Sequence, residues 1–254
     1  MYTGILVPGV GRVFPFRTRA VFRFPFDLML DVLYEDNHLL VVNKPIRLAT
    51  MGLPAGEETL LSRAKAYIAA KYHKPGNVYL GVVSRLDVPV SGVVVFARTS
   101  KAADRLNEQF RAHTVEKIYL AAVDGSPPPE GTCRDWIKED ERHRKCYITR
   151  QGEEKTNQSG AAREAVLHFR RLSRSAKGAL LEVRLETGRK HQIRLQLSHR
   201  GYPVKGDRKY GSPTFLKAGI ALHAKSLSLD HPITKERLTF TADPPAFWKE
   251  LGVQ

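Results

Sequence analysis

Short apolar runs separated by polar turns dominate the chain and predict strands. Residues 28–45, LMLDVLYEDNHLLVVNKP, hold two such runs around a polar turn at 35–38, which predicts two short strands. The run 93–97, VVVFA, predicts a buried strand. Strict alternation of apolar and charged residues over 179–187 predicts a strand with one buried face. Further strands are predicted over 117–125, over 164–172 and within 222–234.

Helical periodicity is confined to a few segments. Apolar residues lie mostly on one face over 59–72, which predicts a helix. Ser100 can cap a second helix over 101–112, and a short C-terminal helix is predicted over 246–251. Residues 187–200 fit a helix or a strand, because their apolar positions alternate and a glycine follows them. Residues 134–151 mix both charges densely and are expected at the surface.

The charge balance narrows the function classes. The chain of 254 residues holds 41 Lys and Arg against 26 Asp and Glu, a formal net charge of +15. Such a protein attracts polyanions, and a nucleic acid is the first candidate. A membrane surface is the alternative, but no apolar run approaches the length of a transmembrane helix and no basic amphipathic helix has a large apolar face. Two cysteines, Cys133 and Cys146, suit a reducing compartment, although one disulfide is possible.

The first 26 residues differ from the rest of the chain. They contain four arginines and no acidic residue, and they lack the continuous apolar segment of a secretory signal. An edge strand, a basic arm and a wrongly chosen start codon all fit this composition. We therefore treat residues 1–27 as a basic N-terminal extension and expect the folded domain over 28–254.

Two clusters of polar residues could carry chemistry. Asp87 lies in a loop between Arg85 and the pair Ser91-Gly92, directly before the predicted strand 93–97, and a rigid loop of this kind can aim a side chain. On local grounds a structural aspartate in a turn is the commoner case.

The second cluster is the cationic segment 187–194, TGRKHQIR. As the first turn of a helix it would form an anion site, and otherwise it would be a solvated basic face. If one of its arginines is buried beside Asp87, it would hold that acid ionised.

Six motifs in order resemble the RluA-type pseudouridine synthases. They are VVNKP at 41–45, RLD-x-x-x-SG at 85–92, K-x-Y-L-A at 117–121, TGRKHQIR at 187–194, G-x-P-V-x-GD-x-x-YG at 201–211 and LHA…HP-x-T at 222–234. The resemblance covers residue 28 to about residue 250. Arg47, Ser84 and Val90 depart from the family's usual Gly, His and Thr, and we expect these departures to alter loop shape and RNA choice.

The resemblance implies a fold and a reaction. The fold is a single α+β catalytic domain with a long, mixed, mostly antiparallel sheet flanked by helices, and an active cleft across its middle. The reaction is isomerisation of uridine in RNA to pseudouridine, without cofactor or metal. Asp87 is the essential acid, which either attacks C1′ of the ribose or removes the C2′ proton to give a glycal.

The resemblance also implies roles for other residues. Tyr119 removes the C5 proton or stacks on uracil, Arg194 keeps Asp87 ionised, and Arg85 fills the gap left by the flipped nucleotide. Without the resemblance, Tyr119 would be taken for a core tyrosine. The remaining substrate-binding residues are expected to be Lys44, Arg189, His191 and Gln192.

The expected partner is a structured ribosomal or transfer RNA, bound by a cytoplasmic monomer without membrane association. A non-catalytic RNA-binding protein or RNA chaperone on the same fold is the alternative. A basic hydrolase using Asp87 as general base is a third possibility, but it would need a second acid or a metal cluster that the sequence does not show.

Overall fold

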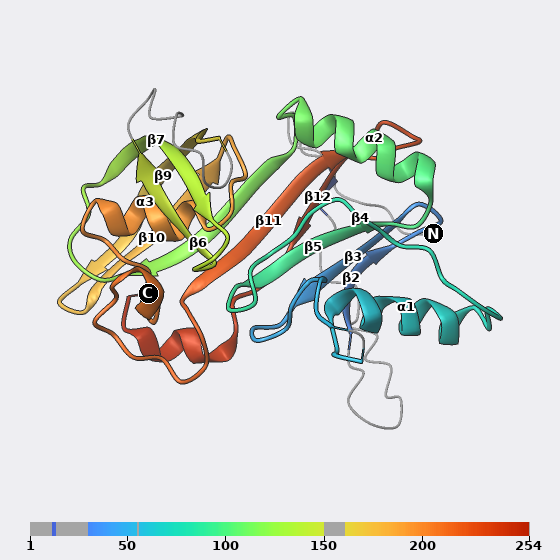
Figure 1. Ribbon diagram of the computed structural model, residues 1–254, viewed down its shortest axis with the longest axis horizontal. Helices are drawn as coiled ribbons and strands as arrows, with labels where there is room; N and C mark the ends of the chain where they lie inside the picture. The colour runs from blue at the N-terminus through green and yellow to red at the C-terminus, as the bar shows by residue number, and fades with distance from the viewer. Residues whose placement is uncertain (1–11, 14–29, 55, 150–160, 254) are drawn as a thin grey trace. The chain divides into compact units, whose positions relative to one another are not determined.

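A computed structural model describes residues 12–13, 30–54, 56–149 and 161–253 (Figure 1). The chain divides into two compact units, each with its own hydrophobic core. The first unit comprises Met1–Glu116 and Ala224–Pro244, and the second comprises Lys117–His223 and Pro245–Gln254. Nearly all of the predicted extension 1–27 and the polar segment 151–160 lie outside the described residues.

The first unit combines a sheet with two α-helices. Its strands are β1 (Arg12–Val13), β2 (Asp31–Glu35), β3 (Leu39–Lys44), β4 (Gly81–Val82), β5 (Ser91–Ala97), β11 (Leu222–Asp230, with its first two residues in the second unit) and β12 (Arg237–Thr241). β3 pairs antiparallel with β2 and β5, β4 pairs antiparallel with β5, and β11 pairs antiparallel with β12. Because β1 and β12 are parallel, the sheet is mixed but mostly antiparallel, as predicted.

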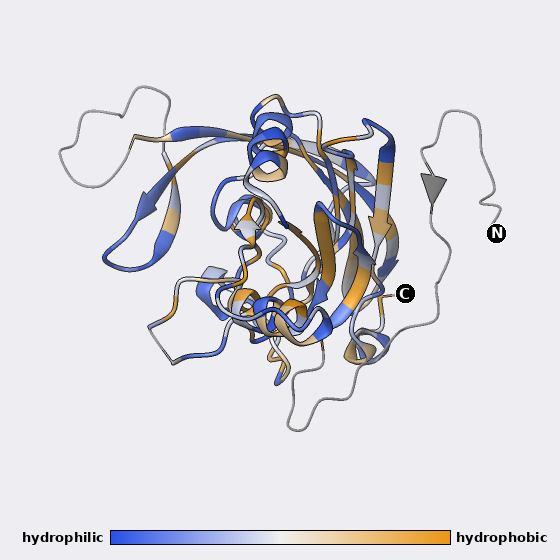
Figure 2. Ribbon diagram, turned by 90° about the vertical axis from the view of Figure 1, so that its right-hand side faces the viewer, coloured by the Kyte–Doolittle hydropathy of each residue, from blue (hydrophilic) through white to orange (hydrophobic). Residues whose placement is uncertain are grey.

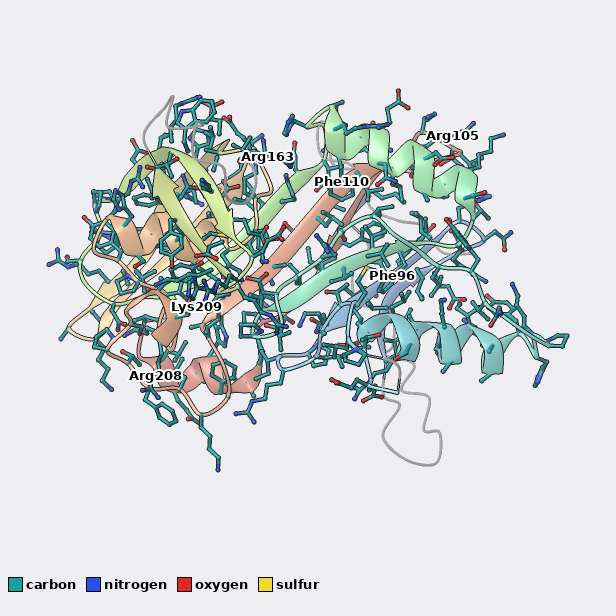
Figure 3. All side chains as sticks on the ribbon, in the orientation of Figure 1. Phe96, Arg105, Phe110, Arg163, Arg208 and Lys209 are labelled. Atoms are coloured by element: carbon teal, nitrogen blue, oxygen red, sulfur yellow. The ribbon has the colours of Figure 1, made fainter. Side chains whose placement is uncertain are left out.

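Strand β5 is buried along its whole length because both faces of the sheet are covered. Val93, Val95 and Ala97 pack in one core with α2 (Ser100–Arg111). Val94 and Phe96 pack in another core with α1 (Leu60–Lys71); Figure 1 shows α1 and α2, and Figure 3 labels Phe96. Gly92 is required at the start of this strand, since a Cβ atom there would collide with the backbone of Ala224. The apolar run 93–97 therefore identified a core strand correctly.

A threonine hydroxyl caps the N-terminus of α1, and another caps that of α2. The Thr59 hydroxyl caps α1 by accepting from the Ser62 N–H, and the Ser62 hydroxyl accepts from the Thr59 N–H. Helix α2 was predicted to start after Ser100, which is wrong by one residue. Thr99 has extended backbone angles, and its hydroxyl accepts from the Ala102 N–H at 3.1 Å, so Thr99 is the cap.

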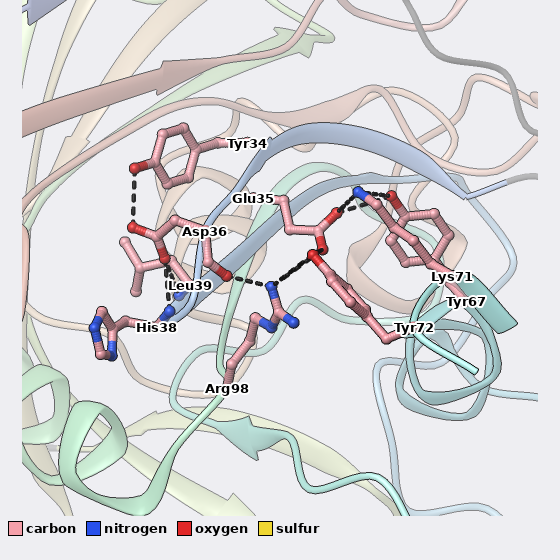
Figure 4. A network of polar contacts seen from close by, with 9 residues as sticks. All are labelled: Tyr34, Glu35, Asp36, His38, Leu39, Tyr67, Lys71, Tyr72 and Arg98. Carbon is pink, nitrogen blue, oxygen red and sulfur yellow. Dashed lines mark hydrogen bonds and ion pairs between the residues drawn. The ribbon is translucent and has the colours of Figure 1, made fainter. Parts of the chain in front are cut away.

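The turn between β2 and β3 carries a network of polar contacts (Figure 4). Asp36 accepts from the backbone N–H groups of His38 and Leu39, each at 2.7 Å. Burial raises the pKa of Asp36, but these two bonds and the side-chain hydrogen bonds with Tyr34 and His231 together outweigh it, so the pKa lies below its usual value. Glu35 accepts from four side chains, namely those of Tyr67, Lys71, Tyr72 and Arg98. The network therefore ties this turn to α1 and to the end of β5.

The second unit has an antiparallel sheet in the order β6-β10-β9-β7-β8. The strands are β6 (Glu116–Val123), β7 (Glu130–Asp140), β8 (Lys145–Thr149), β9 (Arg163–Ser175) and β10 (Gly178–Leu185). One α-helix and two 3-10 helices accompany them, namely α3 (Gln192–His199), η1 (Arg208–Tyr210) and η2 (Ala246–Leu251). The predicted C-terminal helix is present, but it is a 3-10 helix.

The alternation predicted for β10 is confirmed. Leu181, Val183 and Leu185 are buried, while Glu182 and Arg184 are on the other face and more exposed. Hydropathy colouring shows hydrophobic residues gathered in strands and hydrophilic residues over helices and turns (Figure 2). The second unit therefore has one apolar face for α3 and an opposite face that carries charged side chains.

One segment differs from its sequence-based expectation, and a second is compatible with either helix or strand from its sequence. The charged segment 134–151 was expected only at the surface, but most of it forms the β7–β8 hairpin, with Ile137 and Cys146 buried beside α3. Charged residues on the exposed face hid this alternation. Both cysteines of the chain are free and buried. The segment with two possible structures, 187–200, contains α3, whose Gln192, Arg194 and Gln196 are all buried.

Candidate active site

Asp87 lies in a loop that joins β4 to β5. We call residues 84–90 the Asp87 loop. The acid is half-buried, while Arg85 and Val88 on either side of it are exposed. The carbonyl of Asp87 accepts from the Val90 N–H at 3.0 Å, which closes a turn directly after the acid. Val90 is only 3% exposed, so this departure from the family pattern fills the core below the loop.

Hydrogen bonds to main-chain carbonyls hold the Asp87 loop to the end of β3 and the segment after it. Lys44 Nζ donates to the carbonyls of Leu48 at 2.7 Å, Pro45 at 2.9 Å and Val88 at 3.3 Å. The backbone N–H of Arg47 also donates to the Val88 carbonyl at 2.9 Å. Arg47 has a φ of 62° here, in the left-handed region where the family's usual glycine would be unstrained.

Lys44 has no exposed surface in this structure, and its assignment to substrate binding stays a prediction. Burial lowers the pKa of Lys44 to about 7, and the negative charge of Asp87 acts against this shift. Lys44 therefore supports the Asp87 loop from inside the first unit. Lys44 stands directly before a proline at the end of a buried strand, and this sequence context did not show whether its side chain points to solvent or into the fold.

Tyr119 lies on β6 in the second unit. It is half-buried and pairs across the sheet with Val183 of β10. Lys117 lies two residues earlier on the same face of β6. Burial lowers the pKa of Lys117, and the positive charge of Arg189 lowers it further. Sequence reasoning did not single out Lys117, although it stands in the same motif as Tyr119.

Gln192 is 3% exposed and organises the start of the segment 187–194. Its Oε1 accepts from the Thr187 hydroxyl at 2.8 Å and from the Arg189 N–H at 2.9 Å. Its Nε2 donates to the Val166 carbonyl at 3.1 Å. Both ends of the Gln192 amide are therefore engaged within the fold, and its assignment to substrate binding stays a prediction.

Arg194 lies in the first turn of α3, but it is buried there and not exposed. Its Nε and Nη2 donate to the two carboxylate oxygens of Asp207, at 2.6 and 2.9 Å. The guanidinium carbon also lies 5.2 Å from the centre of the Tyr210 ring. This bidentate pair fixes the orientation of the guanidinium. Asp207, in the predicted glycine-rich loop, is a site residue to which sequence reasoning gave no role.

Arg189 and His191 precede the helix. Arg189 is half-buried, its Nε donates to the Glu164 carbonyl at 2.9 Å, and burial lowers its pKa. His191 has a left-handed backbone with a φ of 54°, and its Nδ1 lies 2.7 Å from the Tyr210 hydroxyl. Both keep partly exposed surface, so their assignment to substrate binding stays a prediction.

Several cationic side chains of the second unit are exposed. Arg163, Arg208 and Lys209 of the second unit are exposed (Figure 3). Among the described residues, no group of three or more His, Cys, Asp or Glu side chains could hold a metal ion. No helix in the described part of the chain is long and apolar enough to cross a membrane.

Comparison with known proteins decides the family. A family model described as RNA pseudouridylate synthase matches residues 38–199, well over half of the chain. The chain belongs to the RNA pseudouridylate synthase family. Members of this family are isomerases that convert uridine in RNA to pseudouridine, so the predicted activity class is confirmed.

Relatives agree with this assignment. Ribosomal large subunit pseudouridine synthase D of Xylella fastidiosa is 36% identical over 90% of this chain and 69% of its own length. The tRNA pseudouridine synthase C of Pectobacterium carotovorum is 30% identical over 89% of this chain and 62% of its own length. The solved structure of human RNA pseudouridylate synthase domain containing 4 is 26% identical, covers 87% of this chain and 90% of that chain, and has a TM-score of 0.71. The predicted RluA-type family and its α+β fold are therefore confirmed.

Proposed function

We propose that Asp87 is the catalytic acid of this pseudouridine synthase and that Tyr119, Arg194 and Arg85 act with it on one uridine. The observation that supports the proposal is the way in which the fold holds the Asp87 loop. The residue is half-buried on a loop whose main chain is held by hydrogen bonds, with exposed Arg85 close to it. A group held in this way can meet a reacting atom without further reorganisation.

The proposed reaction breaks the bond between uracil N1 and ribose C1′, turns the base, and joins its C5 to C1′. Asp87 begins it as a carboxylate, by attack on C1′ or by removal of the C2′ proton. In either case the proton on C5 is finally lost and N1 gains one, so the product has the composition of the substrate. We assign the removal of the C5 proton, or stacking on uracil, to Tyr119.

Arg194 is assigned the role of favouring the ionised form of Asp87 during the reaction. The geometry in the second unit supports a fixed cation here, since Asp207 holds the guanidinium by two short bonds. If this role is correct, substitution of Arg194 by Met raises the pKa on the acidic limb of the kcat/KM profile. An unchanged acidic limb would exclude it.

The proposed substrate is a structured RNA, either ribosomal or transfer RNA, because relatives named for each are similar to this chain. The net charge of +15 supports contacts with phosphates, so affinity should fall steeply with salt. Arg85 is proposed to occupy the stack after the uridine is flipped out. We further propose that the protein acts as a monomer in the cytoplasm.

Mapping of pseudouridine in RNA tests the role of Asp87. Wild-type protein and the Asp87→Asn variant are incubated with pools of unmodified ribosomal and transfer RNA. We expect the variant to lose turnover by about 10⁴-fold or more while it still binds RNA in a filter assay. Asp104→Asn, at an exposed position on α2, is the control and should keep full activity.

Two outcomes would contradict the proposal. Turnover by Asp87→Asn at the wild-type rate would remove Asp87 from the mechanism. Binding without turnover by wild-type protein, on every RNA pool, would favour the alternative of a non-catalytic RNA-binding protein on the same fold.

A further inference from the structure

Thr50 is a polar residue of the first unit that the proposed chemistry does not use. It is only 3% exposed and lies between β3 and α1. Its backbone carbonyl accepts from the Leu61 N–H at 3.1 Å, and the neighbouring Ala49 carbonyl accepts from the Leu60 N–H at 2.8 Å. The first turn of α1 therefore fixes the position of the Thr50 backbone.

The hydroxyl of Thr50 makes two hydrogen bonds to one residue of the Asp87 loop. It donates to the Leu86 carbonyl at 2.9 Å and accepts from the Leu86 N–H at 3.1 Å. Leu86 belongs to no strand, so this side chain takes the place of a neighbouring strand. Because the two groups belong to the peptides before and after Leu86, one hydroxyl fixes both peptide planes.

The backbone after Asp87 is fixed by other groups. The Asp87 carbonyl accepts from the Val90 N–H, and the Val88 carbonyl accepts from Lys44 and Arg47. Asp87 therefore lies between two peptide groups that are each held by a hydrogen bond. The direction of its Cα–Cβ bond follows from those two planes, and the bond from Thr50 to the Leu86 carbonyl holds the first of them.

Ser84 uses a similar device at the start of the loop. Its hydroxyl lies 3.3 Å from the Val95 nitrogen and 3.5 Å from the Val95 oxygen. These distances are longer than those of Thr50, so the Ser84 contacts are weaker. The hydroxyl of Thr50 is therefore the stronger constraint on the approach to Asp87.

We infer that Thr50 is a positioning residue for Asp87, linking the first turn of α1 to the peptide that precedes the acid. This inference rests on the proposed catalytic role of Asp87. Thr50 acts through Leu86 and does not touch the RNA. Its loss should slow the chemical step and leave RNA affinity nearly unchanged, because the exposed cations of the protein are untouched.

The experiment compares single-turnover rate constants and RNA dissociation constants of three variants. Thr50→Val keeps the shape of the side chain but has no hydroxyl, and we expect its rate constant to fall by about tenfold to a hundredfold. Thr50→Ser keeps the hydroxyl and should stay within about threefold of wild type. Both should bind RNA within about twofold of wild type.

Thr59→Val is the matched control, since it removes the capping hydroxyl of another buried threonine beside the same helix. It should lower the melting temperature and leave the rate constant unchanged when both are measured below the transition. If Thr50→Val does not fold, Thr50→Ala is measured in the same way at lower temperature.

Three outcomes would overturn the inference. They are a wild-type rate constant in Thr50→Val, an equal fall in Thr59→Val, and a Thr50→Ser rate as low as that of the valine variant. Failure of the proposed function is distinguishable, because an active Asp87→Asn would contradict the role of the acid itself. An inactive Asp87→Asn together with an unimpaired Thr50→Val would contradict only the role of Thr50.

Discussion

The Asp87 loop and the segment 187–194 are both family motifs, but they are held in different ways. The Asp87 loop is held through its main chain, and the side chains of Arg85 and Val88 stay exposed. In the segment 187–194, the polar side chains of Gln192 and Arg194 are themselves buried and hydrogen-bonded. This difference shows that a sequence motif can contain residues that support the fold as well as residues available to a substrate.

The largest expected effect comes from breaking the buried ion pair of the second unit. Asp207→Asn leaves the charge of Arg194 uncompensated in a buried place, so we expect the free energy of unfolding to fall by about 3–5 kcal/mol. Denaturant unfolding measures this loss. Glu164→Gln, in the exposed pair with Arg134, is the control and should cost at most about 1 kcal/mol. Equal losses in the two variants would show that burial does not distinguish these pairs.

A smaller loss is expected when the amide of Gln192 is removed. Gln192→Leu removes the acceptor of the Arg189 N–H bond and one of the donors to the Val166 carbonyl, which also accepts from the Glu186 and Thr187 N–H groups, and this should cost about 1–3 kcal/mol of unfolding free energy. Lys190→Ala, at the exposed neighbour, should change stability by no more than about 0.5 kcal/mol. If Gln192→Leu weakened RNA binding at unchanged stability, Gln192 would be a substrate contact.

Lys44 should give the first unit a dependence on pH. Its pKa is about 7 in the folded protein, whereas a lysine side chain ordinarily has a pKa of 10.5. Between these values the unfolded chain binds more protons, so the free energy of unfolding rises with pH, by up to about 1.4 kcal/mol per pH unit. Below pH 7 both states hold the proton and the contribution is constant.

Denaturant unfolding at several pH values between 7 and 10 measures this slope. Lys44→Met should lack the contribution, whereas Lys101→Met, at an exposed position on α2, should keep it. The same slope in both variants would mean that the buried ammonium does not lose its proton in this range.

The smallest effect on stability is expected at Arg85. Because its side chain is exposed, Arg85→Ala should change the free energy of unfolding by no more than about 0.5 kcal/mol. If Arg85 meets the RNA near a phosphate, the variant should weaken binding and reduce the slope of log K against log salt by about one. Filter binding at several KCl concentrations tests this, and an unchanged affinity would remove Arg85 from the RNA contact.

Sequence patterns predicted those elements whose buried residues form a continuous apolar run or follow a regular period. β5 and β10 showed strand patterns and α1 showed a helical face, and all three are present. The β7–β8 hairpin was missed because charged residues on its exposed face dominate its composition. Helix α3 stayed ambiguous because its polar residues are buried, which breaks the usual relation between polarity and exposure.

For the candidate site, sequence motifs select residues but do not show what each side chain contacts. The motifs identified Asp87, Arg194, Lys44 and Gln192, but the partners of a side chain are not written in its own motif. Lys44 meets carbonyls that lie up to 44 positions away, and Gln192 meets one 26 positions away. Thr50 gave no sequence signal, since a threonine in a loop is common and its partner Leu86 lies 36 positions further on.

The link from α1 through Thr50 to Leu86 also bears on how the protein loses activity. The Asp87 loop continues directly into the fully buried strand β5, so neither end of the loop has a hinge of its own. Its amide hydrogens at Leu86 and Val90 should therefore exchange with solvent as slowly as those of the surrounding core strands. Heating should abolish catalysis at the temperature where the first unit melts, rather than in an earlier and separate step.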